Sequence, residues 1–99
     1  MTRFRVYASV DDGALLLEVQ ANLLEHLNTR AVVPLIPIAA APKAAKILNP
    51  RFEIGETTYV LATQFLATVP RRLLGAEVAD LQAEASVIVN ALDCLFQGV

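Results

Sequence analysis

Apolar and polar residues alternate along Arg3–Ser9 and again along Ala14–Gln20. A period of two is typical of half-buried strands. The residues between them, Asp11–Gly13, favour a turn. These segments therefore predict a hairpin, in whose first strand Phe4 and Tyr7 lie on opposite faces.

The middle of the chain predicts three more strands. Arg30–Ile38 is rich in β-branched residues, and its prolines, Pro34 and Pro37, must lie at an edge, a bulge or a strand end because proline has no N–H. Arg51–Val69 predicts a second hairpin around Gly55-Glu56, a pair typical of a type II′ turn. Two connecting segments remain, the first with at most one helical turn and the second an exposed loop: Ala21–Ala31 and Ala39–Lys46.

The last part of the chain has the period of a helix, from Glu77 to about Phe96. Its apolar residues recur with the 3.6-residue spacing of one helix face: Leu81, Ala85, Ile88, Leu92 and Leu95. Glu77 and Asp80 would then stand in the first turn, where acidic side chains suit the helix dipole. About five antiparallel strands and one terminal helix predict a mostly β fold, a small barrel with the helix docked on it.

The composition predicts one domain, residues 1–99, with more apolar residues than its own core needs. Hydrophobic residues make up 56% of the 99, whereas roughly 45–50% is usual even with Gly included. No uncharged run reaches the ~20 residues of a membrane span, and no signal peptide is evident. The surplus therefore predicts a partner surface, most simply a second copy of the chain.

The net charge and the cysteine content indicate which partners and which cellular location to expect. The net charge of −2 does not favour direct nucleic-acid binding. The single cysteine is consistent with a reducing, cytoplasmic location.

The inventory of catalytic residue types is thin. There is one histidine, His26, interpreted as a surface or loop residue, and one cysteine, Cys94, interpreted as a buried thiol. No cluster of metal-ligating residues and no phosphate-binding glycine loop appear, so we expect no metal, no cofactor and no enzymatic activity. The alternative is metal-free RNA cleavage on a small barrel by Arg30, Arg51, Arg71, Arg72 and Thr63.

Six segments together resemble the CcdB family, the toxins of type II toxin–antitoxin pairs. In chain order they are FRVYAS, LLLEVQANLL, RAVVPLIP, LNPRFEIGETTYVLATQFLATVP, LLGAEVADL and NALDCLFQGV. The resemblance implies an SH3-like barrel with a C-terminal helix, shared with MazF, and a homodimer. It also implies a target, the DNA gyrase A subunit, which such toxins hold in the state with its DNA cut.

The resemblance implies which residues contact gyrase. The helix end and tail correspond here to Gln97, Gly98 and Val99, with Asp93 one turn earlier. Four further residues correspond to positions near the dimer seam or the target surface: Leu23, Leu24, Phe4 and Tyr7.

One position departs from the family pattern. Gyrase poisons of the family end in Trp-Gly-Ile, whereas this chain ends in Gln97-Gly98-Val99. A Trp that stacks on an arginine contributes ~2 kcal/mol when desolvated. Two alternatives to a gyrase poison therefore stay open: a CcdB-like protein that binds only an antitoxin, and a MazF-type endoribonuclease.

The resemblance further implies a cognate antitoxin, whose disordered tail folds on the toxin. The corresponding surface is the loop Ala39–Lys46. Lys43 and Lys46 are natural partners for an acidic tail.

Overall fold

A computed structural model describes residues 3–41 and 43–98 of the chain. Its strands, in chain order, are β1 (Arg5–Ser9), β2 (Leu15–Glu18), β3 (Thr29–Pro37), β4 (Arg51–Ile54), β5 (Thr57–Leu61), β6 (Ala67–Pro70) and β7 (Leu74–Asp80). One α-helix follows, α1 (Ala85–Gln97). Single 3₁₀ turns lie between these elements: η1 (Asn22–Leu24), η2 (Ile38–Ala40), η3 (Thr63–Phe65), η4 (Arg71–Leu73) and η5 (Gln82–Glu84).

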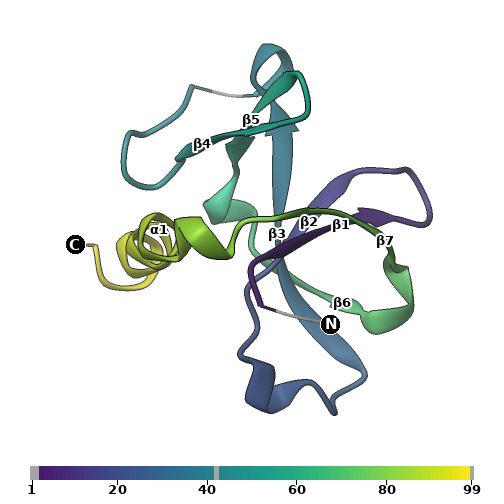
Figure 1. Ribbon diagram of the computed structural model, residues 1–99. Coiled ribbons are helices and arrows are strands. Elements are labelled where there is room, and N and C mark those ends of the chain that lie inside the picture. The colour runs from purple at the N-terminus through teal and green to yellow at the C-terminus, as the bar shows by residue number, and fades with distance from the viewer. Residues whose placement is uncertain (1–2, 42, 99) are drawn as a thin grey trace.

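The strands form one curled antiparallel sheet in the order β4-β5-β3-β2-β1-β7, and β6 pairs with β3 beside β5. Figure 1 shows α1 at one side of this half-barrel, with the β4–β5 hairpin above it and the chain's carboxyl end at the helix's far side. The predicted fold class, mostly β with a C-terminal helix, is confirmed. The described residues contain seven strands rather than about five.

The first hairpin forms as predicted, with Val6 opposite Leu17, but β1 begins at Arg5. Phe4 interrupts the strand because its φ is +68°, a left-handed conformation that is costly for a bulky residue. Two backbone hydrogen bonds hold it there. The Phe4 N–H donates to the Glu18 carbonyl (2.7 Å), and the Phe4 carbonyl accepts from Leu81 (2.8 Å).

The two prolines of β3 lie where the ladder tolerates them. Pro37 is the last residue of the strand. The Pro34 carbonyl accepts a hydrogen bond from Ala62 (2.9 Å), so its ring nitrogen faces the same side of the strand. On that side β6 pairs with residues up to Val32 and β5 begins at Leu35. The missing N–H of Pro34 therefore falls in the gap between two partner strands.

The second predicted hairpin is shorter than expected. Its turn agrees with type II′, since Gly55 has φ +64° and Glu56 does not have a positive φ. The chain leaves β5 after Leu61, makes the turn η3 and returns as β6 along the other half of β3. The apolar pattern of Arg51–Val69 has no interruption between β5 and β6, so it did not indicate that β6 is a separate strand.

The prediction of one helix from Glu77 to Phe96 is wrong in its first part. Residues Leu74–Asp80 are strand β7, which pairs with β1, and α1 begins at Ala85. Asp80 lies across from Arg5 and Glu77 lies across from Tyr7, and both carboxylates form ion pairs with Arg5, Glu77 at 3.1 Å and Asp80 at 3.6 Å. A hydrogen bond from Arg5 to Glu77 raises the pKa of the guanidinium. Cross-strand pairing, not the helix dipole, accounts for these acidic residues.

Hydrophobic side chains are buried on both faces of the sheet. The main core lies under α1 and includes Val6, Leu17, Leu61, Ile88 and Ala91. A second cluster combines Tyr7, Val32 and Leu74 on the opposite face, where the sheet curls upon itself. This cluster accounts for part of the apolar surplus that the composition assigned to a partner.

Candidate functional site

The segment Asn90–Gly98, with Ile47 beside it, is called here the helix end. Helix α1 stops at Gln97 because Gly98 adopts φ +71°, and the Gly98 N–H donates to the Cys94 carbonyl (3.0 Å). This is a left-handed cap, which glycine forms without steric cost. Gln97 and Gly98 are exposed, as a contact surface requires. Val99 lies outside the described residues.

A hollow of about 510 Å³ opens at the helix end. Four residues line it: Ile47, Asn90, Asp93 and Gln97. Phe96 also belongs to this end of the molecule, with 69% of its surface exposed. Asp93 is the one charged side chain within α1, so the helix end is a polar but nearly uncharged surface with an exposed aromatic ring.

The four other predicted contact residues divide into two pairs. Leu23 and Leu24 lie in η1 and are exposed, Leu23 by 87%. Phe4 and Tyr7 are each only 6% exposed and belong to the two cores. Core packing leaves almost none of either ring outside, so a contact of Phe4 or Tyr7 with a partner stays a prediction that the monomer does not favour.

The structure does not bring the exposed leucines to the helix end. Figure 1 places the β2–β3 connection, which carries η1, at the bottom of the molecule and the end of α1 at the left. Within one protomer these are two separate surfaces.

Lys43 and Lys46 are exposed on the loop between η2 and β4. Asn49 holds the end of this loop. Its amide nitrogen donates to the Leu61 carbonyl (2.9 Å), and its amide oxygen accepts from the Ala45 N–H (3.0 Å). Lys46 lines one hollow, of about 400 Å³, and Ile47 lines the hollow at the helix end. The predicted antitoxin loop and the predicted target surface are therefore adjacent.

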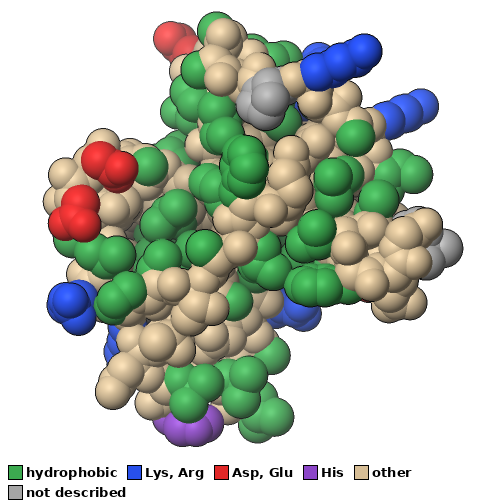
Figure 2. All heavy atoms as spheres, turned by 180° about the vertical axis from the view of Figure 1, so that it is seen from behind, with side chains coloured by type: hydrophobic (Ala, Val, Ile, Leu, Met, Phe, Trp, Pro, Cys, Tyr) green, Lys and Arg blue, Asp and Glu red, His purple; other side chains and the backbone are tan. Residues whose placement is uncertain are grey.

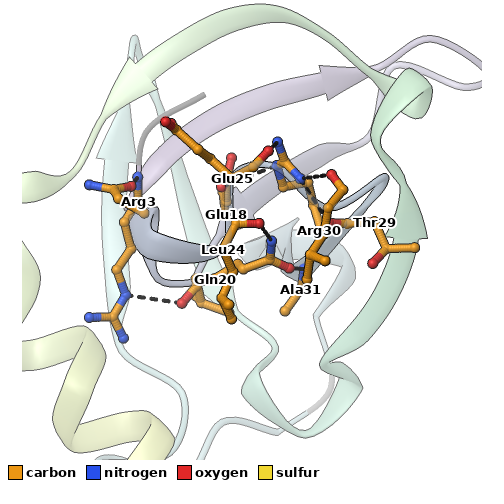
Figure 3. Close-up of polar contacts among 11 residues, drawn as sticks. Arg3, Glu18, Gln20, Leu24, Glu25, Thr29, Arg30 and Ala31 are labelled. Atoms are coloured by element: carbon orange, nitrogen blue, oxygen red, sulfur yellow. Dashed lines mark hydrogen bonds and ion pairs between the residues drawn. The ribbon is translucent and has the colours of Figure 1, made fainter.

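A second candidate region is the β2–β3 connection, residues 21–28, with Arg30 beneath it and Arg71 beside it. It is called here the loop end. The Arg30 guanidinium is fully buried. It donates to the carbonyls of Glu25 (2.6 Å), Leu27 (2.6 Å) and Thr29 (2.8 Å), so the connection wraps around it (Figure 3). One arginine thus organises the backbone of the whole connection.

The charge of Arg30 is balanced by Glu18, which is also buried, with Nε and Oε2 3.6 Å apart. Among the described residues neither Nε of Arg30 nor Oε1 of Glu18 has a hydrogen-bond partner. Burial raises the pKa of the Glu18 carboxyl, and the charge of Arg30 opposes that shift only in part. The pair is therefore a costly feature of this small domain.

Two hollows lie at the loop end and share Arg71. One, of about 370 Å³, is lined by Glu25, His26, Arg30 and Arg71. The other, of about 550 Å³, is lined by Asn28, Pro70, Arg71, Arg72 and Leu74. Glu25 and His26 are exposed, which confirms the interpretation of His26 as a loop residue.

The structure brings together only part of the set that sequence reasoning offered for RNA cleavage. Arg30 and Arg71 line one hollow at the loop end, and Arg71 and Arg72 line the other. Arg51 lies at the hollow beside Lys46, and Thr63 is buried with its hydroxyl donating to the Leu48 carbonyl. Sequence reasoning missed Glu25 and Glu18. The spacing between Glu18 and Arg30 carries no local signal, because the two meet only through the pairing of β2 with β3.

The described residues hold no group of three or more metal-ligating side chains. Cys94 is half-buried in α1 rather than fully buried. In residues 3–41 and 43–98, no helix is long and apolar enough to cross a bilayer.

Two solved structures show that this fold occurs in other proteins. An endoribonuclease from a mycobacterial species superposes with a TM-score of 0.74 at 22% identity, covering 97% of this chain and 90% of that one. An endoribonuclease from a mycobacterial species in complex with its cognate antitoxin superposes with a TM-score of 0.77 at 20% identity, covering 97% and 94%. The fold is thus one that toxin–antitoxin proteins use.

A sequence model of the CcdB protein family matches residues 3–98. The chain belongs to the CcdB family. The antitoxin in the second solved structure is a partner of that protein.

The prediction that the chain is not an enzyme is wrong by this comparison. The prediction rested on the small number of catalytic residue types in the chain and on the resemblance to toxins that bind their target without catalysing a reaction. The two solved structures described above are endoribonucleases, so the fold is compatible with catalysis, and a small number of catalytic residue types does not exclude it.

Proposed function

We propose that this toxin acts on DNA gyrase by binding the A subunit and holding the enzyme with its DNA cleaved. The observation that carries the proposal is the helix end. An exposed phenylalanine, Phe96, stands beside the glycine cap at Gly98 and a hollow lined by Asp93 and Gln97. An exposed aromatic ring on a nearly uncharged surface is typical of an interface anchor. Trapping follows because a ligand that prefers one state shifts the enzyme toward it.

The proposal includes a homodimer. Ten large hydrophobic side chains are exposed among residues 3–41 and 43–98, including Val10, Leu23, Phe65 and Phe96. Figure 2 shows hydrophobic side chains over the middle of one face, with the charged ones mainly at its periphery. A symmetric dimer would cover such a surface. Sedimentation at micromolar concentration should give twice the monomer mass, and a monomer mass would contradict this part of the proposal.

The test of the target is a cleavage assay with purified toxin, gyrase, DNA and ATP, in which trapped double-strand breaks are counted. The Gln97→Trp variant runs beside the wild type. Breaks with the wild type support the proposal. Breaks with Gln97→Trp alone favour the alternative, a CcdB-like protein that binds antitoxin without poisoning gyrase. If neither the wild type nor Gln97→Trp produces breaks, gyrase is excluded as the target.

For the antitoxin we propose an acidic segment that docks on the loop carrying Lys43 and Lys46. Both side chains are exposed, and Lys46 borders a hollow that can receive a carboxylate. Lys43→Glu combined with Lys46→Glu should weaken antitoxin binding about 10-fold or more, because opposite charges at the rim become like charges. Titration calorimetry measures this. An unchanged affinity, with the dimer intact, would place the antitoxin elsewhere.

A second candidate function is endoribonuclease activity of the MazF type. Two observations favour it. Two solved structures with this fold are endoribonucleases. Arg71 lines one hollow with Glu25, His26 and Arg30, and a second hollow with Arg72. Incubation of the purified protein with single-stranded RNA, followed by gel analysis, tests it. Intact RNA would exclude it.

A further inference from the structure

The loop end gathers acid–base and phosphate-binding side chains in one place. The smaller hollow holds a carboxylate, an imidazole and an arginine at its surface, contributed by Glu25, His26 and Arg71. We propose that this hollow is a phosphodiester site, in which single-stranded RNA is cleaved by its own 2′-hydroxyl. The inference rests on the second candidate function and assigns its residues.

The backbone of the connection explains why these side chains are available. The carbonyls of Glu25, Leu27 and Thr29 all turn inward to the Arg30 guanidinium. With its carbonyls fixed inward, the connection keeps the side chains of Glu25 and His26 at the surface. Arg30 borders the hollow but is fully buried, and both of its terminal nitrogens already donate to backbone carbonyls, so it is a positioning residue.

Arg71 is fixed beside the connection by two features. Its N–H donates to the Asn28 carbonyl (2.8 Å). It also directly follows Pro70, which pairs with Thr29 across β3 and β6. Its side chain is exposed and borders both hollows. A guanidinium held in this position is suited to two oxygens of one phosphate.

Arg72 lines the second hollow, together with Asn28. The two hollows share Arg71, so this one can hold the nucleotide next to the scissile phosphate. Two exposed arginines on a chain with a net charge of −2 are expected to bind RNA weakly and with strong salt dependence.

The reaction needs only the RNA and these side chains. The Glu25 carboxylate accepts the proton of the 2′-hydroxyl as the 2′-oxygen forms a bond to phosphorus. The bond from phosphorus to the 5′-oxygen breaks, and protonated His26 gives its proton to that oxygen. Arg71 balances the charge that develops on the phosphate oxygens. The products are a 2′,3′-cyclic phosphate and a 5′-hydroxyl, and transfer of a proton from Glu25 to His26 restores the site.

This chemistry predicts a substrate class. DNA lacks the 2′-hydroxyl that attacks, so DNA of the same sequence should bind without being cleaved. Duplex RNA should also resist, because the in-line approach of the 2′-oxygen requires a nucleotide that is free to leave the A-form geometry.

The experiment uses the full chain with a short single-stranded RNA of mixed sequence, and identifies the product ends by their chemistry. His26→Ala and Glu25→Gln should each lower kcat about 10²-fold, the usual contribution of a general acid or base. Arg71→Ala should lower kcat/KM about 10²-fold. Glu56→Gln and Glu84→Gln are matched controls for Glu25→Gln at exposed positions outside the loop end, and should cleave like the wild type. Circular dichroism confirms that each variant is folded.

The outcomes separate the activity from the site. Cleavage by the wild type with loss in the three loop-end variants supports the inference. Cleavage that persists in all three would leave the activity standing and overturn this site. Intact RNA with the wild type would overturn both the activity and the site. Cleaved DNA, or product ends without a cyclic phosphate, would contradict the 2′-hydroxyl mechanism.

Arg30 has its own test as a positioning residue. Arg30→Lys keeps the charge near Glu18 but cannot reach three carbonyls with one ammonium group. We expect kcat to fall about 10-fold with KM unchanged in the folded fraction of this variant. An unchanged kcat would show that the connection needs no such support.

Discussion

The loop end and the helix end are both exposed, but they are held in place by opposite means. The loop end surrounds a buried ion pair, Arg30 with Glu18, whose guanidinium donates to three carbonyls of the connection. The helix end is held by apolar side chains, Ile88 and Ala91, that are fully buried against the sheet.

The difference matters for what each surface can do. A connection fixed by a buried charge keeps its titratable side chains in defined positions, as catalysis requires. A helix fixed from below by Ile88 leaves its last turn free to present Phe96 and Gln97 to a partner. One small domain therefore offers a surface suited to chemistry and another suited to recognition, and each can be perturbed without the other.

The largest expected effect is at Arg30. Arg30→Met would leave Glu18 buried without its partner and three carbonyls without donors, which should lower the free energy of unfolding by about 3–5 kcal/mol. Denaturant unfolding measures this. Arg30→Met combined with Glu18→Leu should recover much of the loss, since no lone charge then remains buried. A double variant as unstable as the single one would contradict this account.

The second-largest effect on stability is expected for a substitution in the core that anchors α1. Ile88→Ala should cost about 3 kcal/mol, because Ile88 is fully buried in the main core. Val87→Ala, one residue away and 39% exposed, is the control and should cost less than about 0.5 kcal/mol. Equal losses in the two variants would show that α1 is not anchored through its buried face.

The pH dependence should distinguish the two regions. Burial raises the pKa of Glu18 in the folded state above its value in the unfolded chain. The folded state therefore binds more protons, and this contribution to stability is present at low pH and is lost as the pH rises through the folded-state pKa. The stability of the wild type relative to Glu18→Gln should therefore fall as the pH rises above the ordinary range of a glutamate carboxyl. A difference that rises with pH would contradict the burial argument.

The smallest effect is expected at the cap of α1. Gly98→Ala places a Cβ on a residue with φ +71°, which should cost about 1 kcal/mol. Gly98→Asn should cost less, because Asn tolerates this conformation better. Thermal unfolding compares the two. Because Gly98 is also a proposed gyrase contact, a loss of trapping in Gly98→Asn without a loss of stability would separate the contact from the cap.

Several features could be predicted because they depend on neighbouring residues. The II′ turn at Gly55, the cap at Gly98 and the apolar face of α1 each follow from local backbone or side-chain preferences. The same holds for the exposure of His26, Lys43 and Lys46 on polar connections.

Other features could not be predicted because they depend on which strands meet. Residues Leu74–Asp80 form a strand because they pair with β1 and because Glu77 and Asp80 form ion pairs with Arg5. Tyr7, expected near a contact surface, is buried because the curled sheet covers its outer face.

By itself the sequence determined the class of fold, the membership of the family and the short turns, because hydrophobic period and glycine placement act over a few residues. Only the tertiary structure decided that Glu18 meets Arg30 in the interior and that Arg71 joins Glu25 and His26. Those contacts join residues on different strands and connections, and the pairing that creates them leaves no trace in local periodicity.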